Sequence, residues 1–258
     1  MPLYFTFILC FIFGTIIGSF LNVLALRYNT GVTVRGRSKC MSCAKTLTWV
    51  ELVPILSFMI QRGACRSCKA KISWQYPIVE FLSGALFVLL FMLYPPVSLV
   101  ASIVTAMQIF ILCILMVITI YDIKHKIIPD PLVWTFVAAA FLLMFVGNDT
   151  NPFVVPSVMQ LLSGPILALP FALLWFVSHG EWMGLGDAKL ILGIGWMLGL
   201  GYGLTALTMA FWIGAIFSLI YMAVSYKTFK HGLQIPFGPY LILGLYLVMV
   251  TGWQLFVI

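Results

Sequence analysis

Two aspartates stand at the edges of long apolar segments, and their chemistry is the first indication of function. Asp122 directly follows one apolar run, and Asp187 closes the sequence Gly184-Leu185-Gly186-Asp187 before another. Ionisable side chains at membrane edges usually mark functional sites. Two carboxylates held close together do not both ionise readily, so one keeps a proton and the pair can act as general base and general acid. This pairing predicts aspartic-protease chemistry, in which the ionised member activates a water molecule for attack on a peptide carbonyl.

The positions of the aspartates relative to helix ends suggest different protonation states. Asp187 precedes an apolar helix, where the helix dipole favours an anion, so it is expected to lose its proton before Asp122, which ends a helix. A coupled pair nevertheless titrates as a unit. The structural alternative for Asp187 is a helix N-cap. Asp130 precedes Pro131, an arrangement typical of a cap followed by the first helical residue, and is interpreted as structural.

Four cysteines predict a structural zinc site. They form two C-x-x-C pairs separated by 21 residues, namely Cys40 with Cys43 and Cys65 with Cys68. This spacing suits four thiolates around a tetrahedral zinc ion, and zinc would supply folding free energy to a loop with little core of its own. The alternatives are two disulfides, which fit a cytoplasmic loop badly, and a redox pair, which would need a βαβ pattern that the sequence lacks.

The composition is that of a membrane protein. The chain of 258 residues is 63% hydrophobic and 8% charged, whereas soluble domains are about half apolar and about a quarter charged. A helix needs about 20 apolar residues to cross a bilayer core of about 30 Å. Such runs predict an all-α polytopic membrane protein with about eight transmembrane helices, near residues 3–26, 77–94, 97–121, 131–147, 154–178, 187–200, 202–226 and 238–257.

The placement of charge predicts the orientation in the membrane. Lys and Arg gather in short cytoplasmic loops, and nine of the fourteen lie between Arg27 and Lys71. In an eight-helix arrangement the other five fall on the same side, and these are Lys124, Lys126, Lys189, Lys227 and Lys230. Both termini are therefore expected outside the cytoplasm. The net charge of +7 follows from this orientation and does not indicate nucleic-acid binding.

Three regions follow from these patterns. Residues 1–26 form the first transmembrane helix, residues 27–76 a small cytoplasmic zinc-binding domain, and residues 77–258 a membrane domain of seven helices that carries both aspartates. The helix over 97–121 runs toward the cytoplasm, and the helix from 187 starts at the same face. Asp122 and Asp187 are therefore expected at one depth, at the cytoplasmic face of the membrane.

The sequence resembles one known family along nearly its whole length, the bacterial prepilin peptidases of type IV pilus, type II secretion and competence systems. The resemblance includes both cysteine pairs and both aspartates. The blocks that carry it are Gly18-Ser19-Phe20-Leu21-Asn22-Val23 with Arg27, Glu51-Leu52-Val53-Pro54-Ile55-Leu56-Ser57, Arg62-Gly63-Ala64-Cys65-Arg66, Ile72-Ser73, Tyr76-Pro77-Ile78-Val79-Glu80, Asp122 with Ile128-Pro129-Asp130, Gly184-Leu185-Gly186-Asp187-Ala188-Lys189-Leu190, and Ile235-Pro236-Phe237-Gly238-Pro239-Tyr240.

The resemblance implies an intramembrane aspartic endopeptidase of the bacterial inner membrane, with a catalytic pair that matches Asp122 and Asp187. Its substrates would be type IV prepilins and pseudopilins, which are single-helix precursors with a short basic leader. They are cut after a glycine at the cytoplasmic membrane face.

The resemblance also implies a second activity, N-methylation of the newly exposed N-terminus from S-adenosyl-methionine. Relatives with this activity carry the cytoplasmic loop, which is present here. The residues by themselves display no glycine-rich adenosine-binding loop, and the available acids are Glu51 and Glu80. Glu80 lies about one turn into the second helix, where an unpaired carboxylate would cost several kcal/mol, so a partner is expected. Structural and methylation-linked roles both remain open for Glu80.

Two other classes of function fit parts of the pattern. A proton-coupled carrier could use Asp122 and Asp187 to relay ions, although carrier sites usually lie near the bilayer midplane between inverted repeats, and no repeat is visible. A zinc-loop scaffold without catalysis would leave the segment that ends at Asp187 without a purpose.

Overall fold

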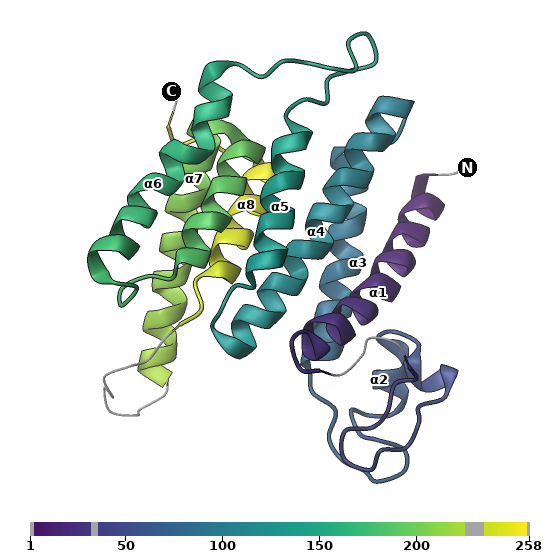
Figure 1. Ribbon diagram of the computed structural model, residues 1–258. Helices are drawn as coiled ribbons and strands as arrows, with labels where there is room; N and C mark the ends of the chain where they lie inside the picture. Colours follow the sequence, from purple (N-terminus) through teal and green to yellow (C-terminus); the bar gives the residue numbers. More distant parts are fainter. Residues whose placement is uncertain (1–2, 32–35, 225–234, 257–258) are drawn as a thin grey trace. The chain divides into compact units, whose positions relative to one another are not determined.

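The structure is a computed structural model that describes residues 3–31, 36–224 and 235–256. Within these ranges the backbone is helical, and β-structure is limited to three isolated bridges, so the predicted all-α class is confirmed. The helices are α1 (Leu3–Arg27), the 3-10 helix η1 (Trp49–Leu52), α2 (Leu56–Ile60), α3 (Gln75–Leu93), α4 (Leu99–His125), α5 (Asp130–Leu143), α6 (Val158–Ser178), α7 (Leu185–Val224) and α8 (Gly238–Thr251) (Figure 1). The predicted cytoplasmic lysines Lys227 and Lys230 lie outside the described residues.

Five of the described helices are long and apolar enough to cross a membrane, and these are α1, α3, α4, α6 and α7. Two predicted spans are shorter than expected. At 14 residues each, α5 and α8 are about 21 Å long. α5 ends at Leu143 because the residues after it turn into a bridge between Val146 and Phe153. α8 ends at Thr251 because Gly252, with a φ of 61°, caps the helix in the left-handed conformation.

One unit of the structure comprises Met1–Pro95 and contains α1, η1, α2 and α3. α1 and α3 pack closely along their length, which small residues allow. A Cβ at Gly14 would lie 2.8 Å from the Cα of Gly84, and one at Gly18 would lie 2.6 Å from the Cβ of Ser83. Gly14 and Gly18 are therefore helix-packing positions. The cysteine-bearing loop, residues 28–74, connects the two helices (Figure 1).

The second unit comprises Pro96–Ile258 and contains α4 to α8. α7 contacts α5, α6 and α8, and α4 contacts α5 and α8 (Figure 1). The helical conformation of α7 is interrupted at Gly199, which has φ 77° and ψ −179°. A Cβ at Gly203 would lie only 3.8 Å from the Cα of Gly195, so the chain turns back on itself at Gly199. The two helices predicted over 187–200 and 202–226 correspond to the two arms of this hairpin, and Gly199 lies at its turn.

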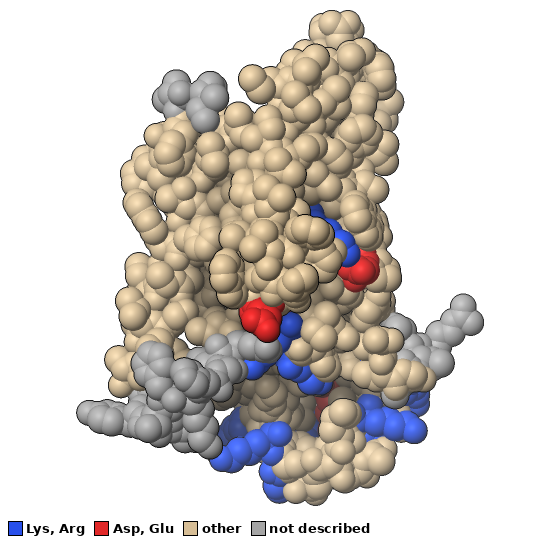
Figure 2. All heavy atoms as spheres, turned by 60° about the vertical axis from the view of Figure 1, so that its left-hand side comes forward, with Lys and Arg blue, Asp and Glu red and all other residues tan. Residues whose placement is uncertain are grey.

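The surface of the described helices is largely apolar. Ile8, Phe13, Phe176 and Leu219 are each more than half exposed. Figure 2 shows one face on which most atoms belong to uncharged residues, with only a few Lys, Arg, Asp and Glu side chains. Such a surface is suited to hydrocarbon, and the protein is a multi-pass membrane protein.

Candidate active site and cysteine cluster

Asp122 is buried in the last turn of α4. It is 4% exposed, and its Oδ2 accepts a hydrogen bond of 3.1 Å from the backbone N–H of Gly238. Gly238 is the first residue of α8, so the carboxylate lies at a helix N-terminus, where the dipole favours an anion. A Cβ at Gly238 would lie 2.7 Å from Oδ2. This approach of backbone to carboxylate therefore requires glycine.

Asp187 lies in the first turn of α7 and is half-buried. Its backbone N–H donates a hydrogen bond of 3.2 Å to the carbonyl oxygen of Gly184. Its carboxylate interacts electrostatically with that of Asp122. The structure thus brings together the two aspartates that the sequence singled out, from the end of one helix and the start of another.

Ile128 joins the two aspartate-bearing segments. It lies in the loop between α4 and α5 and is 9% exposed. A Cβ at Gly186 would lie 2.8 Å from the Cβ of Ile128, and one at Gly238 would lie 3.3 Å from its Cδ1. The Ile128 side chain therefore fills the space between the two glycines beside the aspartates. Sequence reasoning gave Ile128 no role, because an apolar residue in a loop carries no chemical signal.

Asp130 is not the helix cap that the sequence predicted. Pro129 occupies the cap position of α5, and it makes no capping hydrogen bond through its side chain. The Oδ1 of Asp130 instead pairs with the Nζ of Lys189 at 2.6 Å, and Nζ lies 5.7 Å from the ring centroid of Trp134. The pair connects the first turn of α5 to the start of α7, two residues beyond Asp187.

The four predicted metal ligands form one cluster. The sulfur atoms of Cys40, Cys43, Cys65 and Cys68 all lie within 4.8 Å of one another, and the Sγ atoms of Cys40 and Cys68 are 3.8 Å apart. Four sulfurs at about 2.3 Å from a tetrahedral zinc ion would be about 3.8 Å from each other. All four cysteines are free thiols, so the arrangement has the geometry of a metal site and lacks disulfides.

Backbone amides favour the thiolate form at the first cysteine of each pair. Hydrogen bonds from the amides of Cys43 and Ser42 lower the pKa of Cys40 to about 6. Amides at the corresponding positions of the second pair lower the pKa of Cys65. Metal ions bind thiolates and not thiols. The loop backbone therefore prepares these sulfurs for a cation.

Glu51 and Glu80 both have structural partners. Oε2 of Glu51 accepts hydrogen bonds from the backbone N–H of Thr48 at 2.8 Å and from its hydroxyl at 2.9 Å. Oε2 of Glu80 accepts a hydrogen bond of 2.7 Å from the backbone N–H of Ile55, and its carboxylate also interacts with the Ser19 hydroxyl. The expected partner of Glu80 is thus the backbone of the cysteine-bearing loop.

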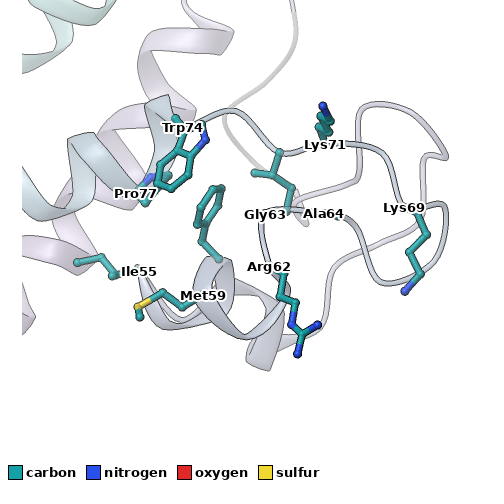
Figure 3. A pocket seen from close by; sticks show the side chains of 11 residues that line it. Ile55, Met59, Arg62, Gly63, Ala64, Lys69, Lys71, Trp74 and Pro77 are labelled. Atoms are coloured by element: carbon teal, nitrogen blue, oxygen red, sulfur yellow. The ribbon is translucent and has the colours of Figure 1, made fainter.

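A pocket of about 910 Å³ lies within the first unit, between this loop and the start of α3 (Figure 3). Its eleven lining residues include three cations, Arg62, Lys69 and Lys71, and no acid. The others are apolar or small: Ile55, Phe58, Met59, Gly63, Ala64, Ile72, Trp74 and Pro77.

Two protein-family models match the chain, one in each of its two units. Residues 12–94, which include the four cysteines, match the bacterial peptidase A24 N-terminal domain. Residues 109–219, which include Asp122 and Asp187, match the type IV leader peptidase family. The chain belongs to the type IV leader peptidase family.

Similar family members span nearly the full length of the chain. A protein of Bacillus subtilis (strain 168) is 29% identical over 94% of this chain and 93% of its own length. A protein of Vibrio cholerae is 29% identical, with 95% and 96% covered, and one of Aeromonas salmonicida is 28% identical, with 95% and 91% covered. All three are named prepilin leader peptidase/N-methyltransferase. No solved structure matches the chain.

Proposed function

We propose that this protein is an aspartic endopeptidase that removes the basic leader from type IV prepilins and pseudopilins, with Asp122 and Asp187 as its catalytic pair. The observation that carries the proposal is the meeting of these two carboxylates at the ends of α4 and α7. Membership of the leader peptidase family assigns the reaction class and makes an ion carrier an unsuitable description.

The orientation predicted from charge fits this reaction. With Lys124, Lys126 and Lys189 in the cytoplasm, the carboxylates lie at the cytoplasmic face and reach only peptide bonds at that depth. The short basic leader of a precursor is cytoplasmic, so the bond after its glycine meets the pair there. If α5 and α8 also cross and the α7 hairpin counts as two, the chain makes eight crossings, and both termini are expected outside the cytoplasm of a bacterial inner membrane.

In the mechanism that follows, the ionised aspartate takes a proton from water as the oxygen attacks the scissile carbonyl. The protonated aspartate donates its proton to the carbonyl oxygen, which gives a tetrahedral diol. The aspartate that took the proton from water then donates it to the leaving amine as the C–N bond breaks, and the other aspartate recovers its proton from a diol hydroxyl. Asp187 lies in the first turn of α7, and Asp122 contacts the first amide of α8. Because both carboxylates lie at helix N-termini, helix dipoles do not decide which one holds the proton, and the pair titrates as a unit.

The cysteine cluster is proposed to hold one structural zinc ion through Cys40, Cys43, Cys65 and Cys68. The sulfur spacing fits a tetrahedral ion, and the polypeptide around it has few buried apolar residues, with Cys65 the only hydrophobic core residue between α1 and α3 among those described. Zinc would supply folding free energy to this loop when bound.

N-methylation of the product from S-adenosyl-methionine is the proposed second activity, since the similar proteins are named for it. The pocket in Figure 3 is a poor match to the sulfonium cation of this methyl donor, because its charged lining residues are all cationic. We therefore assign no residue to the donor.

Incubation of the purified protein with a detergent-solubilised prepilin tests the proposal. Mass spectrometry of the product should show cleavage after the leader glycine. A further increase of about 14 Da should require S-adenosyl-methionine, because each methylation replaces a hydrogen with a methyl group. An uncut precursor with folded wild-type protein would contradict the assignment.

A further inference from the structure

The pocket in the cysteine-bearing loop has an apolar end and a cationic end. Figure 3 shows Ile55, Trp74 and Pro77 on the side of α3, while Lys69 and Lys71 extend from the loop on the other side. The rings of Phe58 and Trp74 are in contact, with centroids 4.8 Å apart. A ligand that fills this pocket therefore needs an apolar part beside α3 and an anionic part beside the lysines of the loop.

The charge of the lining residues indicates the charge of the ligand. Arg62, Lys69 and Lys71 are exposed, and no acidic residue lines the pocket. In Figure 3 the Arg62 and Lys69 side chains both point away from the apolar residues of the pocket. The basic leader of a precursor is repelled by such a site.

Exposed apolar residues continue from the pocket along α2. Leu56, Met59 and Ile60 are 57%, 67% and 64% exposed, and Trp74 is 68% exposed. A small loop domain surrounded by water rarely exposes so many large apolar side chains together. Trp beside apolar and cationic residues is typical of the membrane interface. Pro77 belongs to α3, a candidate membrane span, so the pocket adjoins the bilayer surface.

We propose that this pocket binds the headgroup of an anionic phospholipid. The phosphate lies toward Arg62 and Lys69, and the upper acyl chains lie against Ile55, Met59 and Trp74. The cationic end of the pocket then faces the anionic headgroup, and its apolar end, beside the membrane-spanning helix, faces the acyl chains. Juxtamembrane Lys and Arg recognise anionic lipids in this manner.

Glu80 fixes the apolar end of the pocket. Ile55 has φ 61° and ψ −54°, a conformation that is strained for a β-branched residue. Its N–H is held by the Glu80 carboxylate at 2.7 Å. Through this bond α3 determines where Ile55 and the start of α2 lie, so the lipid site is built onto the membrane-spanning helix itself.

Native mass spectrometry of the delipidated full chain in detergent, titrated with phosphatidylglycerol or phosphatidylcholine, tests the proposal. Wild-type protein should bind phosphatidylglycerol in preference. In the variant R62Q/K69Q, the ratio of the affinity for phosphatidylglycerol to that for phosphatidylcholine should fall by about tenfold or more. R37Q/K39Q removes the same charge from exposed residues of the same loop that do not line the pocket, and it should bind like wild type. The charge-conserving variant R62K/K69R should retain most of the binding.

Quenching of tryptophan fluorescence by brominated phosphatidylglycerol supplies a second measurement, and a W74F substitution should remove part of the quenching. The proposal is overturned if R62Q/K69Q keeps both its zinc and its preference for phosphatidylglycerol. It is overturned as well if inorganic phosphate at millimolar concentration displaces the lipid, because that result would indicate a site for soluble anions. It is also overturned if R62Q/K69Q loses binding of labelled S-adenosyl-methionine while lipid binding is unchanged.

Discussion

At the scale of single residues, the site depends on how closely backbone approaches the two carboxylates. The Gly238 amide donates to Asp122, and Gly184 and Gly186 precede Asp187. These glycines differ in the space around them. A Cβ at Gly184 would lie 3.5 Å from the Asp187 carboxylate, an ordinary contact, whereas one at Gly238 would lie 2.7 Å from the Asp122 carboxylate.

Gly238→Ala is therefore expected to displace the Asp122 carboxylate and lower kcat by about 100-fold, since a shift of about 1 Å in a catalytic group has such effects. Gly184→Ala serves as the matched control and should change kcat by only a few fold. Cleavage rates at saturating precursor, with thermal unfolding as a check on folding, measure the difference. Equal kcat values for the two variants would contradict the proposed placement of Asp122.

At the scale of helices, an ion pair connects the start of α7 to α5. Lys189 pairs with Asp130 on α5, and the Lys189 side chain is 16% exposed while that of Asp130 is 65% exposed. Pairs with one exposed member contribute about 1 kcal/mol or less to stability. The importance of this pair is expected to lie in positioning Asp187, two residues away.

Lys189→Met should accordingly lower cleavage by about tenfold with a loss of about 1 kcal/mol or less in stability. Lys124→Met removes an exposed cation from the last turn of α4 and should leave both quantities near wild type. An unfolding midpoint and a cleavage rate for each variant separate the two effects. A large loss of stability with normal activity per folded molecule would show that the pair is structural only.

The cysteine-bearing loop should depend on its metal. Cys65→Ser is expected to lose the bound zinc, about one ion per chain in wild type, and to expose residues 36–74 to proteolysis because metal binding supplies folding free energy there. Cys113→Ser changes a thiol outside the cluster and should retain zinc. Elemental analysis and limited proteolysis provide the readouts. Full zinc content in Cys65→Ser would exclude this cysteine as a ligand.

The sequence predicted most helices and the cysteine cluster, because the patterns that indicate them are local. Apolar runs and C-x-x-C spacing are local, so the sequence located most helices within a few residues and identified the four clustered cysteines. It missed contacts that depend on tertiary packing. The Asp130 pair with Lys189, the Glu80 bond to Ile55 and the Ile128 contact with Gly186 all join segments that lie apart in the chain.

At the scale of the whole molecule, the orientation depends on the hairpin in α7. A continuous helix of 40 residues would be about 60 Å long, about twice the bilayer core. With the turn at Gly199, we expect the two arms to cross as separate spans. The number of crossings would then be even, and we expect the two ends of the chain on the same side of the membrane.

Reporter fusions at the C-terminus test this arrangement. Alkaline phosphatase, which is active only outside the cytoplasm, should be active there, and it should be inactive when inserted at Gly36 in the basic loop. Activity at Gly36, or inactivity at the C-terminus, would contradict eight crossings with both ends outside.

The most direct test of the central claim is the rate of prepilin cleavage by Asp122→Asn, Asp187→Asn and the double variant, with Glu181→Gln as the control for an exposed acid. Residues that act as one catalytic unit have non-additive effects. Both single variants should lose nearly all cleavage, the double variant should be no slower than either, and Glu181→Gln should match wild type. Substantial cleavage by either single variant in folded protein would contradict a catalytic pair formed by Asp122 and Asp187.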